Sequence, residues 1–262
     1  MTIFDKIGAP QILRGLTAAL AIGGTLFALS ANPTAAKPQK PKTLVELFTS
    51  QGCNSCPPAN ALLKKYNDRD DVIALSLPVD YWDYLGWPDT FGKKQFSNRQ
   101  RRYASTRGDG QVYTPQVVAN GVAHAVGSRP HAVNGAIKKS YGTVSHHQIP
   151  LSITKQGNTL TISSNTADKD SFLQTDKRKV KTTLWLAMTT KKVEVAVPRG
   201  ENHGKIITYY NVVRDLKPVA TWTGQPLTIT LPKNVSMNEK TDGCVVFLQE
   251  GTVGPIIAAA EL

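Results

Sequence analysis

One stretch of the chain, residues 44–66, constrains the fold more than any other. It opens with an apolar run of strand length, Leu44 to Phe48, and passes through a Gly-containing turn to the C-x-x-C motif Cys53-Asn54-Ser55-Cys56. Apolar residues at helical spacing follow as far as Tyr66. The pattern predicts a strand, a turn that carries both cysteines, and a helix that starts near Pro57 or Pro58, because a residue before proline disfavours the α region.

The spacing of the two cysteines favours redox chemistry over zinc binding. Two intervening residues let the sulfurs form a disulfide, and the N-terminus of the following helix favours a thiolate. A zinc site needs four ligands, and no second C-x-x-C or paired histidine group follows at a suitable spacing. We expect Cys53 to attack and Cys56 to resolve, although the helix favours a thiolate on Cys56 almost as much. A static structural disulfide is the alternative.

The N-terminal segment has the pattern of an export signal. Lys6 and Arg14 precede an apolar, glycine-broken run over residues 16–29, and small residues follow, so residues 1–36 are predicted to be a signal peptide. An uncleaved anchor is the alternative. Residues 37–42, KPQKPK, are predicted to be a flexible linker. We therefore expect a periplasmic or secreted protein, with no stable membrane span after cleavage, in a compartment where disulfides persist.

The chain is basic. Its formal net charge is +12, and without residues 1–36 it is 29 basic minus 18 acidic residues, or +11. Such a charge suits anionic surfaces, but a solvated basic surface is the preferred interpretation. A predicted helix over residues 91–107 carries six of these charges, Lys93, Lys94, Arg99, Arg101, Arg102 and Arg107. Because no groove-reading motif accompanies them, we expect no nucleic-acid partner.

Four segments of the chain together resemble a known family. They are VELFTSQGCNSCPPANALL, VDYWDYLGW, YTPQVVANG and RGENHGKIITYYNVVRDL. The chain resembles the secreted thioredoxin-like family called domain of unknown function 1223 (DUF1223), a name that carries no established activity. The resemblance to thioredoxin-like proteins implies an α/β domain over residues 43–145. The Trp-Cys-Gly-Pro-Cys-Lys form of thioredoxin itself is absent.

The same resemblance assigns roles near the cysteines. It implies that the Thr114-Pro115 peptide bond is cis and lies beside the C-x-x-C motif, with the backbone of Thr114 pairing with a substrate chain. Glu46 resembles the buried acid beneath the thioredoxin thiols and could relay protons to Cys56. A surface carboxylate on an edge strand is the alternative for Glu46.

The remaining pattern of the first half predicts a β-α-β-α-β-β-α order. Strands are expected at 71–77, 116–119 and 123–126, with an Asn120-Gly121 hairpin turn, and a helix at 130–141. The loop after Pro78 is rich in aromatic residues. We expect Tyr81 and Trp82 to form a substrate-binding wall beside the thiols, or alternatively to close the core.

Residues 146–262 are predicted to form a smaller, mostly antiparallel β-sandwich domain packed on the first. Seven strands are expected, at 148–154, 159–163, 182–189, 206–213, 227–231, 243–249 and 254–260. The polar loop Arg199–Gly204 could reach over the thiols, but a tight turn held by Glu201 and Asn202 is the preferred interpretation.

The third cysteine and the histidines carry weaker signals. Cys244 lies in an apolar run and is predicted to be a buried, inert thiol. No histidine pairing predicts a metal site, and no cofactor is expected; a copper site that joins His124 to the two motif cysteines is a minor alternative.

The leading hypothesis is an exported thiol-disulfide oxidoreductase that acts on a protein or small thiol/disulfide partner. The alternatives are a binding or accessory protein with a structural Cys53–Cys56 disulfide, and a copper-handling protein.

Overall fold

The first half of the chain alternates strands with helices. A computed structural model describes residues 42–144, 149–164, 181–232 and 240–262; the expected signal peptide, the linker except Lys42, and the expected junction between the two halves lie outside these residues. The elements in order are β1 (Thr43–Thr49), α1 (Pro57–Asn67), β2 (Val72–Pro78), the 3-10 turn η1 (Asp83–Leu85), α2 (Lys94–Arg107), β3 (Gln116–Ala119), β4 (Ala123–Val126) and α3 (Pro130–Val144). Among the described residues, no helix has the length and apolarity needed to cross a membrane.

The second half consists of strands. They are β5 (Leu151–Gln156), β6 (Thr159–Ser164), β7 (Thr182–Ala196), β8 (Ile206–Trp222), β9 (Leu227–Pro232), β10 (Gly243–Glu250) and β11 (Ile256–Glu261). All seven lie close to the predicted positions, but β7 and β8 continue well beyond them. These two strands form one long hairpin, because their pairing extends from Thr182–Trp222 to Ala196–Ile206.

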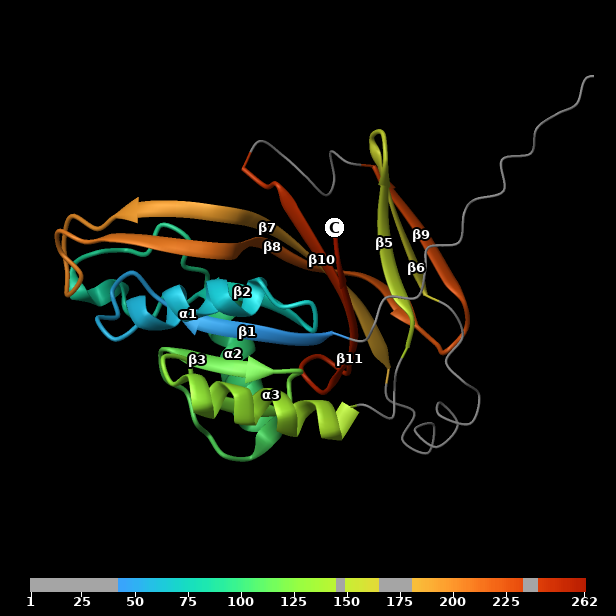
Figure 1. Ribbon diagram of the computed structural model, residues 1–262, viewed down its shortest axis with the longest axis horizontal. Helices are drawn as coiled ribbons and strands as arrows, with labels where there is room; N and C mark the ends of the chain where they lie inside the picture. Colours follow the sequence, from blue (N-terminus) through green and yellow to red (C-terminus); the bar gives the residue numbers. More distant parts are fainter. Residues whose placement is uncertain (1–41, 145–148, 165–180, 233–239) are drawn as a thin grey trace, which may run out of the picture. The chain divides into compact units, whose positions relative to one another are not determined.

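Strands from both halves share one large mixed sheet (Figure 1). Its order is β11-β10-β7-β8-β2-β1-β3-β4, and a separate small antiparallel sheet has the order β5-β6-β9. β1 and β2 are parallel along their whole length, whereas β1 and β3 are antiparallel. β8 joins β2 through a parallel contact between Ser76 and Val212. The sequence pattern identified the strands but not this shared sheet.

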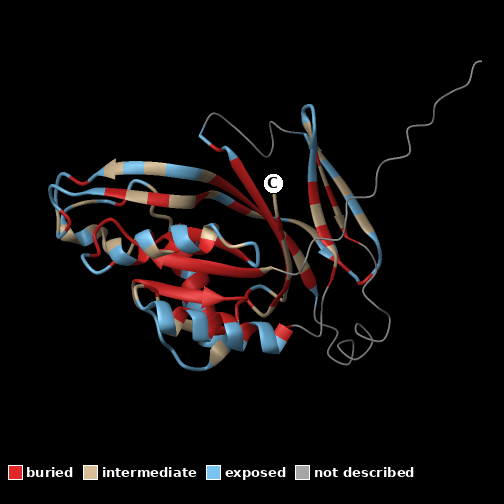
Figure 2. Cartoon of the chain, in the orientation of Figure 1, coloured by how far each residue is buried: buried red, intermediate tan, exposed pale blue. Residues whose placement is uncertain are grey.

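The two faces of β1 contact different helices. Val45 and Leu47 pack with α1 and α3, while Leu44 and Phe48 pack with α2 and with strands of the second half. This follows from the alternation of side chains along a strand. Every residue of β1 and β2 is buried, because helices cover both faces of this part of the sheet. Figure 2 shows this burial along β1.

The small sheet packs face to face on one end of the large sheet. Apolar residues of β5 and β6, such as Ile153 and Leu160, share a core with Leu186 of β7 and Val246 of β10. The predicted second half therefore contains sheet-on-sheet packing, but one of the two layers is continuous with the sheet of the first half. The predicted separate domain and the observed shared sheet differ because β8 pairs with β2 across the predicted boundary. The sequence of either strand alone does not indicate which strand it pairs with.

The Asn120-Gly121 hairpin prediction is confirmed. Both residues have positive φ, 45° and 73°, and they join β3 to β4. Gly121 is also required by a close approach, since a Cβ atom there would lie 2.3 Å from the carbonyl oxygen of Gly254. The turn thus packs against the β10–β11 connection.

Candidate functional site

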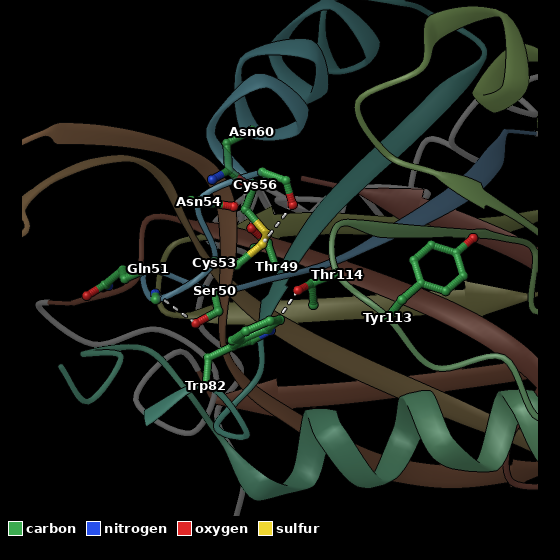
Figure 3. The surroundings of a disulfide bond; sticks show 12 residues. Thr49, Ser50, Gln51, Cys53, Asn54, Cys56, Asn60, Trp82, Tyr113 and Thr114 are labelled. Carbon is green, nitrogen blue, oxygen red and sulfur yellow. Dashed lines mark hydrogen bonds between the residues drawn. A yellow bond between two sulfur atoms is a disulfide. The ribbon is translucent and has the colours of Figure 1, made fainter. Parts of the chain in front are cut away.

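The two motif cysteines form a disulfide where β1 passes to α1 (Figure 3). Their Cα atoms are 5.4 Å apart, and Cys56 is the residue that precedes α1. Cys53 is 2% exposed and Cys56 is fully buried. The hydroxyl of Ser55, which is exposed, lies 3.4 Å from the Cys53 sulfur and is a possible hydrogen-bond donor to it. The strand, turn and helix predicted around the cysteines are confirmed.

The start of α1 has few free N–H groups. Pro57 and Pro58 occupy its first two positions and have no N–H. The next two N–H groups, of Ala59 and Asn60, both donate to the Cys56 carbonyl at 2.9 and 3.1 Å. A thiolate at this helix start would therefore depend on the helix dipole and on Ser55 more than on free backbone donors.

The aromatic loop meets the cysteine turn at Trp82. A Cβ atom on Gly52 would lie 3.1 Å from Trp82 Cβ, so the glycine allows this close approach. The indole N–H of Trp82 donates to the Thr114 hydroxyl at 2.7 Å, which places Thr114 beside the same turn (Figure 3). Tyr84 stacks on Trp82 with ring centroids 6.4 Å apart and is 77% exposed.

The other two predicted binding residues lie around Thr114 and Trp82. The Thr114-Pro115 peptide bond is cis, as the resemblance implied, and Pro115 is buried. Tyr81 turns toward α2, where its hydroxyl donates to Gln100 at 3.1 Å. Burial raises the pKa of Tyr81 to about 12, so its hydroxyl stays protonated at neutral pH.

Gln51 connects the cysteine turn to the rest of the site. Its side-chain oxygen accepts the Trp87 indole N–H at 2.8 Å, and its side-chain amide donates to Thr90 at 2.8 Å. Its backbone N–H donates to the Asp89 carboxylate at 2.7 Å. A fully buried side chain with these partners fixes the backbone just before the first cysteine.

Asp89 is the acidic group of this network. Its second carboxylate oxygen accepts the Phe91 N–H at 2.8 Å. Burial raises the pKa of Asp89 to about 6, although the backbone donors, including that of Gln51, act in the opposite direction. The helix predicted to start at residue 91 starts at Lys94, and Asp89 stabilises the loop before it.

The loop between β7 and β8 reaches the cysteine turn from the second half. Asn202 is fully buried, and its amide nitrogen donates to the carbonyl oxygens of Gln51 at 2.9 Å and of Cys53 at 2.8 Å. Glu201 accepts the Asn54 N–H at a longer distance, 3.4 Å. The loop is a tight turn, but backbone hydrogen bonds close it, whereas the side chains of Glu201 and Asn202 contact the cysteine segment. These contacts support the alternative in which the loop reaches the cysteine segment, and not a turn held by the two side chains.

Glu46 lies on the other face of the sheet from α1. Its carboxylate forms a buried ion pair with Arg99, with 2.6 Å between Oε1 and Nε, and also accepts the Tyr103 hydroxyl. Arg99 donates to Gln249 of β10 at 2.9 Å. An edge-strand surface position for Glu46 is wrong, because β1 is central and Glu46 is 1% exposed. Its contacts give it a structural role and do not support a relay to Cys56. Arg99 is likewise not part of a solvated basic face.

Cys244 and His124 lie apart from these contacts. Cys244 is a buried free thiol in β10, and burial raises its pKa to about 12. His124 is held by Asp109, with Nε2 and Oδ2 3.1 Å apart, and by the Tyr113 hydroxyl at 2.9 Å. Within the described ranges, no three His, Cys, Asp or Glu side chains are grouped as metal ligands. These contacts give no support to a copper site with the motif cysteines.

Three residues make contacts in the site that were not predicted from the sequence: Gln51, Asp89 and Asn202. Gln51 and Asn202 lie in segments that the family resemblance identified, so their positions were visible but their partners were not. Their hydrogen bonds join residues up to 151 positions apart. No local spacing rule predicts contacts of that kind.

Solved structures resemble this fold over most of the chain. A crystal structure of an Agrobacterium tumefaciens protein from a structural genomics consortium is 33% identical, with a TM-score of 0.71, and the match covers 86% of this chain and 95% of that one. HBP35 of Porphyromonas gingivalis matches with a TM-score of 0.56 and 14% identity over 85% of this chain and 75% of its own, which shows likeness of fold only. No curated protein matches significantly. A family model, protein of unknown function DUF1223, matches residues 44–249, and the chain belongs to that family.

Proposed function

We propose that this protein is an exported thiol-disulfide oxidoreductase with a thioredoxin-like core, in which Cys53 and Cys56 exchange disulfides with a protein or small thiol partner. The observation that carries the proposal is the disulfide at the β1–α1 junction beside Thr114 and Trp82. The order of elements from β1 to α3 resembles that of thioredoxin. The signal-like pattern of residues 1–36 supports a compartment in which such exchange takes place.

The exchange proceeds in two balanced steps. In the reduced protein the Cys53 thiolate attacks one sulfur of a substrate disulfide, a mixed disulfide forms, and the other substrate sulfur leaves as a thiolate. The Cys56 thiolate then attacks the Cys53 sulfur and releases the second substrate thiol. Two electrons pass from the protein to the substrate, and the protein ends with the Cys53–Cys56 disulfide. The reverse sequence oxidises a substrate dithiol.

A structural disulfide is the second candidate, and one observation favours it. Cys53 is only 2% exposed and Cys56 is not exposed at all, whereas an attacking sulfur must be reached by its partner. The two candidates differ in reduction potential. Catalytic pairs span roughly −120 to −270 mV, while structural disulfides typically lie below about −300 mV.

Equilibration with a glutathione or dithiothreitol buffer tests the proposal. We expect a potential in the lower part of the catalytic range, roughly −200 to −270 mV, because Pro57 and Pro58 remove two donors that would stabilise the reduced form. A potential below about −300 mV, together with a large loss of thermal stability on reduction, would establish the structural disulfide instead.

Trapping of a mixed disulfide assigns the two roles. A Cys56→Ser variant is expected to form a stable adduct with a peptide disulfide through Cys53, because no resolving thiol remains. Cys53→Ser is the matched control and should form none. If only Cys53→Ser forms an adduct, the redox function stands and the two roles are exchanged. If neither variant does, the proposed exchange is contradicted.

A further inference from the structure

The strongest unassigned feature near the disulfide is the contact that the β7–β8 loop makes with it. Within residues 197–205 the loop is closed by its own backbone: the Val197 N–H donates to the Lys205 carbonyl and the Gly204 N–H donates to the Val197 carbonyl, both at 2.9 Å. Gly200 and Gly204 have positive φ, 77° and 78°. From this self-contained turn the buried side chain of Asn202 donates to the cysteine segment, and the exposed Glu201 accepts the Asn54 N–H at the longer distance of 3.4 Å.

The amide of Asn202 is fully used. Both of its N–H groups donate to the cysteine segment, and its Oδ1 accepts the Lys205 ammonium at 2.9 Å. The Cys53 carbonyl that it binds also accepts the Cys56 N–H at 3.2 Å. One side chain thus fixes the carbonyl that closes the turn between the two sulfurs, and it does so from a position 149 residues away.

We propose that Asn202 is a positioning residue for the Cys53–Cys56 pair, and that its hydrogen bonds favour the disulfide over the dithiol. In the oxidised protein the S–S bond already holds the turn, so the two carbonyls face Asn202 without further loss of conformational freedom. In the dithiol the turn must be ordered before Asn202 can bind it. By linkage, removal of Asn202 destabilises the oxidised form more than the reduced form. The effect of Asn202 on the disulfide does not require the proposed function, but a role for Asn202 in catalysis rests on it.

Reduction of the purified protein by dithiothreitol tests the inference. The reagent supplies two electrons and two protons, its own sulfurs close into a ring, and Cys53 and Cys56 become thiols. We expect Asn202→Ala to shift this equilibrium toward the dithiol by about tenfold, which equals about 1.4 kcal/mol, and to be reduced faster than the unmodified protein. Asn202→Asp, which keeps the size but loses the donors, should shift the equilibrium in the same direction.

The matched control is His203→Ala, since His203 is the exposed neighbour in the same loop. It should keep the equilibrium and the reduction rate of the unmodified protein. A merely structural role for Asn202 would lower the melting temperatures of the oxidised and reduced forms equally and leave the equilibrium unchanged, within about twofold. That outcome would overturn the inference.

A second measurement needs no variant and covers the case in which Asn202→Ala does not fold. By the same linkage, reduction should loosen the loop, so backbone amides of residues 199–205 should exchange with deuterium faster in the reduced protein than in the oxidised one. Equal exchange in both forms would contradict the coupling. The failure of this inference can be distinguished from the failure of the proposed function. The proposed function is tested by the reduction potential of the unmodified protein. This inference is tested by the shift of the reduction equilibrium in variants and by the difference in amide exchange between the two redox states.

Discussion

Single residues of the site have ionisation properties that follow from their burial, and Asp89 is the clearest example. The residue is 7% exposed, and its carboxylate accepts the backbone N–H groups of Gln51 and Phe91. Burial nevertheless raises its pKa to about 6, above the ordinary 3.8. The folded protein therefore binds this proton more tightly than the unfolded chain does. The stabilisation is fully present below pH 3.8 and is lost as pH rises through 6.

This linkage predicts a specific pH dependence for Asp89→Asn. In the unmodified protein, Asp89 should lower the free energy of unfolding by up to about 3 kcal/mol between pH 4 and pH 6 or 7, and the variant should lack that decline. Urea unfolding across this range measures it. The control is Asp70→Asn, which changes an exposed carboxylate and should keep the original slope. Parallel slopes for Asp89→Asn and the unmodified protein would show that Asp89 is not the group responsible.

Cys244 is a buried free thiol that is costly to ionise. Burial raises its pKa to about 12, and the thiolate is the form that reacts. In the reduced native protein at neutral pH, iodoacetamide should therefore label Cys53 or Cys56 and spare Cys244, as peptide mass spectrometry would reveal. Labelling of Cys244 is expected only in denaturant. Native labelling of Cys244 at the rate of the motif cysteines would contradict its assignment as an inert core residue.

At the scale of elements, α2 and β10 are joined to β1 by one buried charge network. Arg99 of α2 pairs with Glu46 of β1 and donates to Gln249 of β10, and it lies over the rings of Trp185 and Phe247, 5.6 and 5.4 Å from their centroids. Removing one partner of a buried ion pair leaves an uncompensated charge. The network therefore makes the packing of α2 depend on a strand from the second half.

Arg99→Ala should be strongly destabilising, by about 3 to 5 kcal/mol, because it leaves Glu46 buried without its partner. Arg102→Ala on the exposed face of the same helix should change the free energy of unfolding by less than about 0.5 kcal/mol. The double variant Glu46→Leu/Arg99→Met should be more stable than Arg99→Ala, since no unpaired charge remains. Urea unfolding of the three variants would decide this, and equal losses for Arg99→Ala and Arg102→Ala would contradict the role of the network.

The elements themselves were largely predictable from local pattern, whereas their long-range partners were not. An apolar run of strand length marked β1, and Asn120-Gly121 marked the β3–β4 turn. The helix start at Pro57 followed from proline geometry. In contrast, the hydrogen bonds of Arg99 with Gln249 and of Asn202 with Cys53 join residues more than 140 positions apart. A charged helix position looks solvated from sequence alone, and a loop asparagine looks like a local turn residue, because only the tertiary fold supplies the partners that compensate their burial.

At the scale of the whole molecule, the sheet does not divide at the predicted boundary. β2 is buried along its length and contacts β8, where the Ser76 hydroxyl donates to the Tyr210 carbonyl at 2.9 Å and Asn211 donates to the Ala74 carbonyl at 3.2 Å. One apolar cluster contains residues of β1 and β2 together with Val213 of β8 and Phe247 of β10. Removing the second half would therefore expose both an edge and a face of the first.

A fragment of residues 37–144 is accordingly expected to fail as an independent domain, even though it contains every element from β1 to α3. It would lose the β8 partner of β2, the Gln249 partner of Arg99 and one side of the shared apolar cluster. We expect weak near-ultraviolet circular dichroism, binding of a hydrophobic dye and no cooperative urea transition, as for a collapsed chain without fixed packing. Residues 37–262 are the control and should unfold in one transition that coincides by tryptophan fluorescence and far-ultraviolet circular dichroism. A cooperative transition in the fragment would mean that the first half folds alone, and that β8 and β10 are additions to a complete core.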